Sequence, residues 1–394
     1  MLVRSRWRRR LLVTAVVIPT LGLALWIAIH RVRWLGPMLA DGARAVLGPD
    51  AGAKIEDFAY GVDDRVKRVL HREDKPQAYW DVPTATTSAA SAPAPPADGG
   101  APAPAPYRPT DVGPMFPQWA APGDGTWLPV ADARRPDEAP RMWKTLLHPD
   151  RIRAWAAVSI AALDLSRVDV QLVAGRYEPE AEEKEAKGYV RPAVVPPERH
   201  GALLAAWNGG FKATHGHHGM RIDGVTLIRP HKDGCTVALY TDGHLAIRTW
   251  SAIADGEPTM TWWRGTPGCM VEQGKLHPGL VDDNTYWGAT LEGSTVIRRS
   301  AIGLSEDGKV LYVGVGDATA APAIARAMKH AGAFDVAQLD VNWSYPKFLV
   351  YEPKEPGSDT LVAKALCKGF EFADDEYIGE RAQRDFFYAT RKGD

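Results

Sequence analysis

Residues 302–315 read IGLSEDGKVLYVGV, and their pattern indicates the architecture of the chain. Two mostly apolar runs, at 302–304 and 309–315, flank Glu306-Asp307-Gly308. An Asp-Gly pair between apolar runs is a strong signal of a β-hairpin, because glycine readily adopts the positive φ that such a turn needs. The sequence therefore predicts two antiparallel strands joined by a tight turn.

The same device recurs on the N-terminal side, where the runs 236–240 and 244–250 flank Thr241-Asp242-Gly243. Residues 168–173 alternate as a half-buried strand does, and 202–207 form a short apolar run. One stretch, AAPAIARAMKHA at 320–331, predicts a helix, and 336–339 predict the strand after it. Many hairpins and few helices indicate an α+β fold with mainly antiparallel or mixed sheets.

The N-terminal segment has a different character. Residues 11–29 read LLVTAVVIPTLGLALWIAI without a charge, and five arginines precede them. About 20 apolar residues span a bilayer, and a positive flank stays inside. We expect a signal-anchor transmembrane helix, a cytoplasmic N-terminus, and a main domain that is periplasmic or extracellular. The alternative is a cleaved signal peptide, although Trp26-Ile27-Ala28-Ile29 is a poor cleavage sequence.

These observations divide the chain into four parts. Residues 1–33 are the basic tail and the signal anchor, and 34–81 are a membrane-proximal segment with an amphipathic helix between Ile55 and His71. Residues 82–125 are a Pro/Ala-rich linker that we expect to be disordered, because it cannot bury a core. Residues 126–394 form the main domain, and we expect a fragment from about Trp127 to fold alone.

Charge and cysteine content narrow the function classes. The formal net charge is -1, so composition gives no indication of nucleic-acid binding. The chain has three cysteines, Cys235, Cys269 and Cys367. A Cys235–Cys269 disulfide is the expected pairing, because both residues lie near predicted strand ends. Three unpaired, partly buried thiols are the equal alternative.

Polar residues cluster at the ends of three predicted strands, where functional side chains often lie. The candidate binding residues are Asn208, Gly209, Gly210, Arg299, Asn342, Trp343 and Ser344. Asn208 and the two glycines are suited to contact a phosphate or a sugar hydroxyl, although a strand-exit turn is the alternative. Arg299 is suited to clamp a phosphate, and its alternative is a strand arginine without a role in binding.

Two aspartates are the candidate catalytic carboxylates. Asp340 ends an apolar strand, an unusual place for a solvated carboxylate, so a functional role is favoured over a buried pair with Arg299. Asp317 holds the same position after 313–316, although it could cap the next helix. His215, His217 and His218 have spacing that a metal site could use, but no neighbouring acid or cysteine completes a set. We therefore expect a solvated loop there, with no metal and no cofactor.

These motifs, in this order, resemble the phosphodiester glycosidase domain of the N-acetylglucosamine-1-phosphodiester "uncovering" enzyme and its bacterial relatives. The likeness runs over residues 151–351 and rests on NGGF at 208–211, RSAIGL at 299–304 and the segment ending in Leu339-Asp340. The chain departs from the family at Lys212, where a second aromatic is usual. It departs again at Val341 and Trp343, which replace glycines and reshape the pocket beside Asp340.

The resemblance implies a hydrolase that acts on a phosphate-linked sugar of an envelope polysaccharide or glycoconjugate. Asp340 and Asp317 would then supply the two carboxylates of glycoside hydrolysis, and His217 would act as a general acid/base or a phosphate contact. The expected partners are a carbohydrate or glycosyl-phosphate substrate and, through the N-terminal helix, a membrane. The alternative is a catalytically inactive polysaccharide-binding or scaffold protein of the same fold, with Trp343 stacked on a sugar.

Overall fold

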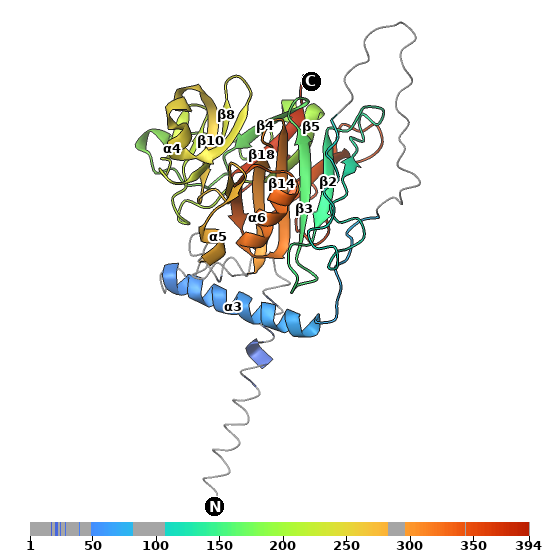
Figure 1. The fold of residues 1–394 in the computed structure, drawn as a ribbon. Helices are drawn as coiled ribbons and strands as arrows, with labels where there is room; N and C mark the ends of the chain where they lie inside the picture. Colours follow the sequence, from blue (N-terminus) through green and yellow to red (C-terminus); the bar gives the residue numbers. More distant parts are fainter. Residues whose placement is uncertain are drawn as a thin grey trace, which may run out of the picture. The chain divides into compact units, whose positions relative to one another are not determined.

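The computed structural model describes residues 49–81, 107–282, 296–342 and 344–393, together with single residues between 17 and 39 (Figure 1). The chain divides into two compact units, Met1–Ala59 and Tyr60–Asp394. Helix α3 runs from Pro49 to Leu70. The amphipathic helix predicted between Ile55 and His71 corresponds to its C-terminal part, and the predicted end differs from the observed one by one residue. The second unit holds three β-sheets and the candidate functional residues.

An eight-stranded sheet forms the centre of this unit, with the strand order β1-β2-β3-β14-β13-β15-β11-β12. Its strand pairs are all antiparallel. In chain order its strands are β1 (Leu128–Val130), β2 (Met142–Leu147), β3 (Ala157–Asp164), β11 (Val271–Glu272), β12 (Lys275–Leu276), β13 (Ile297–Leu304), β14 (Val310–Thr319) and β15 (Asp335–Val341).

The hairpin predicted at 302–315 is confirmed as β13 and β14. Leu304 pairs with Leu311 and Ile302 with Val313, and Gly308 takes a φ of +70° in the turn. Next to this hairpin, all eight residues of β3 are buried. Because both faces of the sheet are covered at this point, β3 carries mostly apolar residues on both of its faces rather than alternating.

Helix α6 (Ala321–His330) covers one face of the eight-stranded sheet, as Figure 1 shows. Ile324 and Met328 of the helix pack with Ala301 and Val336 of the sheet. The opposite face packs against the other two sheets in a larger core, which includes Ile302 and Leu339. The helix predicted at 320–331 and the strand after it are therefore confirmed within one or two residues.

Two five-stranded antiparallel sheets complete the unit. The first, in the order β7-β6-β10-β8-β9, contains β6 (Met220–Ile222), β7 (Val225–Ile228), β8 (Cys235–Tyr240), β9 (Leu245–Thr249) and β10 (Met260–Thr266). The second, in the order β17-β16-β5-β18-β4, contains β4 (Val168–Val173), β5 (Leu203–Asn208), β16 (Phe348–Pro353), β17 (Leu361–Ala365) and β18 (Phe386–Arg391). The short helices are α4 (Trp250–Ile253), α5 (Gly279–Asp282), η1 (Lys184–Ala186), η2 (Pro197–Ala202) and η3 (Ala254–Thr259).

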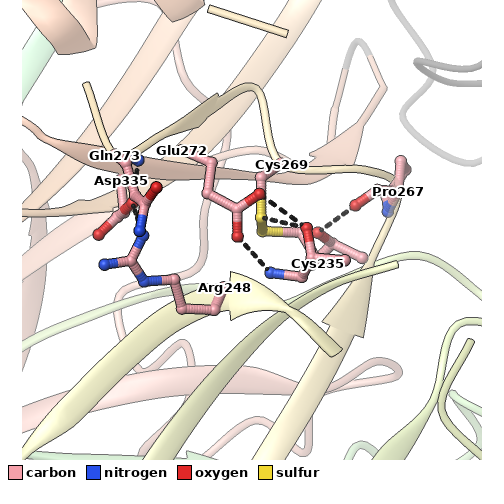
Figure 2. The surroundings of a disulfide bond; sticks show 9 residues. Cys235, Arg248, Pro267, Cys269, Glu272, Gln273 and Asp335 are labelled. Carbon is pink, nitrogen blue, oxygen red and sulfur yellow. Dashed lines mark hydrogen bonds and ion pairs between the residues drawn. A yellow bond between two sulfur atoms is a disulfide. The ribbon is translucent and has the colours of Figure 1, made fainter. Parts of the chain in front are cut away.

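A disulfide joins Cys235 and Cys269, so the expected pairing is confirmed (Figure 2). It links β8 of one five-stranded sheet to the segment just before β11 of the eight-stranded sheet. An ion pair of 3.2 Å between Arg248 and Asp335 joins the same two sheets. Cys367 is free and buried, and burial raises the pKa of its thiol to about 12.

The structure contradicts the predicted transmembrane topology. The expected span at 11–29 lies almost entirely outside the described residues, and no helix in the described part of the chain is long and apolar enough to cross a membrane. The longest described helix, α3, has the length but carries charges such as Asp63, Asp64 and Lys67 along it. The fold class is corrected accordingly: the part of the chain that the structure describes is β-rich α+β with antiparallel sheets and few helices, and it contains no helix that could span a membrane.

The part of the predicted linker that the structure describes, residues 107–125, packs on the sheet domain. The ring of Tyr107 meets Trp143 edge-on at 5.2 Å, and the Val112 amide donates to the Gly125 carbonyl at 2.9 Å. Proline and alanine dominate the sequence on the N-terminal side of Tyr107, and residues 82–106 lie outside the described part. The few apolar side chains within 107–125 are enough to fix this segment on the core.

Candidate functional site

The candidate residues Asn208 and Asp340 meet where two sheets join. Asn208 ends β5 and Asp340 lies near the end of β15, and the Asp340 amide donates to the Gly209 carbonyl at 3.1 Å. The Asn208 amide group donates to the Ser300 hydroxyl at 2.8 Å, and that hydroxyl donates to the Asp340 carbonyl oxygen at 3.0 Å. Since Asn208 is fully buried, its amide holds the junction together rather than facing solvent.

Gly209 and Gly210 are explained by close packing. The Gly210 amide donates to Asp385 Oδ2 at 3.0 Å, and the Gly209 amide donates to the Asp385 carbonyl at 2.9 Å. A Cβ atom on Gly209 would lie 2.2 Å from Asp385 Oδ2, and one on Gly210 would lie 2.7 Å from Arg264 Cζ. The buried Arg264–Asp385 pair therefore leaves no room for a side chain at either glycine. The two backbone amides donate to Asp385 and not to a ligand.

This ion pair, Arg264–Asp385, is completely buried. Arg264 Nε lies 2.8 Å from Asp385 Oδ2, and both side chains have zero exposure. The same guanidinium donates to the carbonyl oxygens of Phe211 at 2.5 Å and His218 at 2.9 Å. One buried cation thus fixes both ends of the loop that follows NGGF.

Asp340 has a partner that the sequence did not reveal. Its side chain is 1% exposed and forms an ion pair with Arg384, while its Oδ1 accepts the Val341 amide at 2.9 Å. Burial raises the pKa of Asp340, and the Arg384 charge offsets only part of that effect. The Arg384 guanidinium also lies over the Tyr345 ring, 4.3 Å from its centroid. Asp340, Arg384 and Tyr345 thus form one group, called the Asp340 group below.

Arg299 belongs to a different environment. It is fully buried, and its guanidinium donates to the Thr319 carbonyl at 3.1 Å and to Gln338 Oε1 at 3.2 Å. Its neighbour Ser300 contacts Asn208, and successive side chains of a strand point to opposite faces. Arg299 therefore lies on the face of β13 away from Asn208, and the structure does not bring these two candidates together.

Asp317 lies on β14 in a second charged group. Its side chain is 48% exposed, and its Oδ1 is 3.4 Å from Arg298 Nε. Arg298 also donates to the Gly369 carbonyl at 2.8 Å and lies over the Phe370 ring. The Arg298 carbonyl accepts the Asn342 amide at 3.1 Å, which connects this group to the segment after Asp340.

The segment after β15 forms a local turn. Asn342 Oδ1 accepts the Ser344 amide at 2.8 Å and the Ser344 hydroxyl at 2.9 Å. Both residues are half-buried, and this pattern is the usual one for an asparagine that shapes a turn. Trp343, the proposed stacking residue, lies outside the described residues.

The histidine loop is separate from the Asp340 group. His217 is 61% exposed and pairs with Glu182 at 2.5 Å, and none of its contacts with described residues reaches Asp340. His218 is half-buried, and burial, with Arg264 next in effect, lowers the pKa of its imidazole to about 3. Among the described residues, no group of three or more His, Cys, Asp or Glu side chains is placed to hold a metal ion.

Sequence reasoning missed Arg384, Asp385 and Arg264. Arg384 and Asp385 stand directly before the apolar strand β18, and Arg264 lies inside the apolar strand β10. A charge at the start or in the middle of a buried strand is costly unless it is paired. That rule identifies all three as paired residues, although it does not name their partners.

No protein-family profile matches the chain, and no curated protein matches it. Solved structures show a distant likeness in fold. The catalytic domain of zebrafish N-acetylglucosamine-1-phosphodiester alpha-N-acetylglucosaminidase, auto-inhibited by its pro-peptide, has 15% identity and a TM-score of 0.38 over 66% of this chain and 85% of that chain. A hypothetical protein from Synechocystis has 9% identity and a TM-score of 0.33, over 65% of each chain. A protein from Burkholderia pseudomallei has 10% identity and a TM-score of 0.33, over 60% of this chain and 74% of that one.

Proposed function

We propose that the chain is a hydrolase that cleaves the bond between a sugar and a phosphate. The observation that carries the proposal is the Asp340 group, in which a buried carboxyl, a guanidinium and a phenol meet at the junction of two sheets. A carboxyl group with a raised pKa is a stronger base than an ordinary aspartate once it is ionised. A guanidinium beside it suits the negative charge of a phosphate.

In the proposed reaction, Asp340 accepts a proton from the water that attacks the anomeric carbon. The bond between that carbon and the phosphate oxygen breaks, and its electron pair remains on the phosphate. Arg384 offsets the charge of the departing phosphate. Glycoside hydrolysis uses a second carboxylate, and Asp317 is our candidate because half of its side chain is exposed on β14. We assign no role in the reaction to Arg299, which is enclosed by the protein, or to His217, which pairs with Glu182.

The test is hydrolysis of a panel of sugar 1-(methyl phosphates) by the whole chain and by Asp340→Asn. We expect the variant to lose at least about 100-fold in kcat, the usual contribution of one acid/base group, while staying folded. Asp359→Asn, at an exposed aspartate, is the matched control and should keep full activity. Turnover by Asp340→Asn at the wild-type rate would remove this residue from the mechanism.

A structural role for Asp340 predicts a different result. Asparagine would then leave Arg384 as a buried, unpaired charge, at a cost of about 3–5 kcal/mol in unfolding free energy. The double variant Asp340→Asn/Arg384→Met would recover much of that stability. Absence of turnover in the wild type, with polysaccharide binding retained, would assign the chain to the binding or scaffold class instead.

A further inference from the structure

Two buried tyrosine hydroxyls have no hydrogen-bond partner among the residues that the structure describes, and both oxygen atoms are inaccessible to solvent. One belongs to Tyr345 of the Asp340 group, and the other to Tyr377, whose ring stacks on Phe386, two residues after Arg384. Nearby Tyr351 differs, because its hydroxyl donates to the Glu376 carbonyl at 2.8 Å. A buried hydroxyl without a partner is costly, so such groups usually mark the place of a bound water or ligand.

Two cationic side chains lie near the Tyr345 ring. The Arg384 guanidinium lies 4.3 Å from its centroid and Lys347 Nζ lies 5.9 Å from it. Both cationic side chains are mostly buried, with 11% and 8% exposure. In a poorly solvated place such as this, a positive charge acts strongly on a nearby anion.

The carboxylates in the same region are already engaged. Asp340 is paired with Arg384, Asp385 with Arg264, and Glu376 with Lys347 at 2.7 Å. Because each negative charge has its own cation, the region does not exclude an anion by uncompensated repulsion. An incoming anion would share the Arg384 guanidinium with Asp340.

Tyr377 is held firmly in its place. It is 1% exposed, takes a φ of 64°, and stacks on Phe386 with the ring centroids 4.2 Å apart. Its carbonyl accepts the Val195 amide at 2.7 Å. A left-handed φ in a bulky residue persists only where the surroundings enforce it. Burial raises the pKa of Tyr345 and of Tyr377 well above the ordinary value, so both phenols remain protonated and able to donate.

We propose that the hydroxyls of Tyr345 and Tyr377, together with the Arg384 guanidinium, bind a phosphate group. Two neutral donors and one cation match the oxygen atoms and the charge of a phosphate, and binding gives both hydroxyls the acceptor that they lack. The identification of this phosphate as the one in the substrate rests on the function proposed above. The two tyrosines then position the phosphate so that the sugar carbon lies beside Asp340.

The experiment measures the binding of inorganic phosphate to the whole chain by calorimetry, and thermal unfolding without phosphate. Tyr345→Phe and Tyr377→Phe should each weaken phosphate binding about tenfold or more, because a hydrogen bond to an anion is lost. Each should keep or raise the melting temperature, because an unpaired buried hydroxyl has been removed. Tyr351→Phe is the matched control: it should lower the melting temperature and leave the affinity for phosphate unchanged.

Two results would overturn the proposal. One is a wild-type chain that binds no phosphate at millimolar concentration. The other is an affinity that neither tyrosine variant changes, which would mean that bound water satisfies these hydroxyls. The outcome is separable from that of the proposed function. Phosphate binding as expected without sugar-phosphate hydrolysis refutes the hydrolase alone, whereas Asp340-dependent hydrolysis with unchanged phosphate affinity in Tyr345→Phe refutes this site alone.

Discussion

His218 shows how burial changes the chemistry of a single residue. Its imidazole contacts the rings of Phe211 and His231, with centroid distances of 5.5 and 5.8 Å. Burial and the Arg264 charge lower its pKa to about 3, whereas an imidazole in an unfolded chain titrates near about 6.5. The folded protein therefore keeps this histidine neutral, which suits a place beside a buried guanidinium.

This difference predicts a loss of stability in acid. Between about pH 6.5 and about pH 3, the unfolded chain binds a proton at His218 that the folded chain does not, so unfolding becomes easier as pH falls, by up to about 1.4 kcal/mol per pH unit. We expect His218→Gln to remove this dependence in urea unfolding at pH 7 and pH 5. His217→Gln, at an exposed position, should keep it. Equal pH dependence in the wild type and His218→Gln would contradict the assignment.

Asp340 shows the opposite shift at the same scale. A raised pKa means that the folded state binds the proton of this carboxyl more tightly than the unfolded chain does, so the contribution of Asp340 to stability is largest at low pH and is lost as pH rises through the pKa of the folded state. As pH falls, the His218 contribution therefore lowers the free energy of unfolding, whereas the Asp340 contribution raises it. Only variants at each site can separate the two contributions.

At the scale of the elements, the Arg264–Asp385 pair joins three strands. Arg264 comes from β10 and Asp385 immediately precedes β18, while the Gly210 that contacts both follows β5. Strands from two different sheets are thus held by one buried charge pair. The same guanidinium also donates hydrogen bonds to backbone carbonyls of the loop that carries His217 and His218.

The loss of one partner is expected to strand the other charge inside the protein. Arg264→Met and Asp385→Leu should each cost about 3–5 kcal/mol in unfolding free energy, and the double variant should cost clearly less than their sum. Urea unfolding of all four proteins measures this coupling. The exposed pair Arg229–Glu183, 3.0 Å apart, is the control, and the same cycle there should give below about 1 kcal/mol. Additive losses at Arg264 and Asp385 would show that the two charges do not depend on each other.

At the scale of the whole molecule, the segments before Trp127 contribute to the folded unit. Asp64 forms an ion pair of 2.6 Å with Arg153, and Lys144 lies over the Trp80 ring at 4.4 Å. Tyr79 and Trp80 pack against the larger core, and Tyr107 packs against the core beneath α6. These contacts argue against the expectation that a fragment from Trp127 folds by itself.

A fragment of residues 60–394 should therefore be more stable than one of residues 127–394. Full burial of a large apolar side chain contributes about 1.5–3 kcal/mol, and these three aromatic side chains are half-buried, so their loss should lower the unfolding free energy by at least about 2 kcal/mol. Urea unfolding of the two fragments, followed by tryptophan fluorescence and by circular dichroism, measures the difference. Equal midpoints and slopes would show that the segment adds nothing to the core.

The sequence by itself determined the local elements of this protein. Asp-Gly turns between apolar runs predicted the hairpins β8–β9 and β13–β14, and the stretch at 320–331 predicted α6. These features follow from backbone geometry within a few residues, so they can be read without the fold. Asn208 and Asp340 were also found this way, because each is a polar residue at the end of an apolar strand.

The tertiary structure alone decided which of these residues meet. Arg384 and Asp385 are 44 and 45 residues from Asp340, and Arg264 is 121 residues from Asp385, so no local pattern connects them. The reason for Gly209 and Gly210 is likewise a buried ion pair from distant strands. The sequence made Arg299 and Asn208 candidates for the same binding site, yet Arg299 lies on the face of β13 that points away from Asn208. Long-range pairing sets burial, and burial sets the charge and the partners of each side chain.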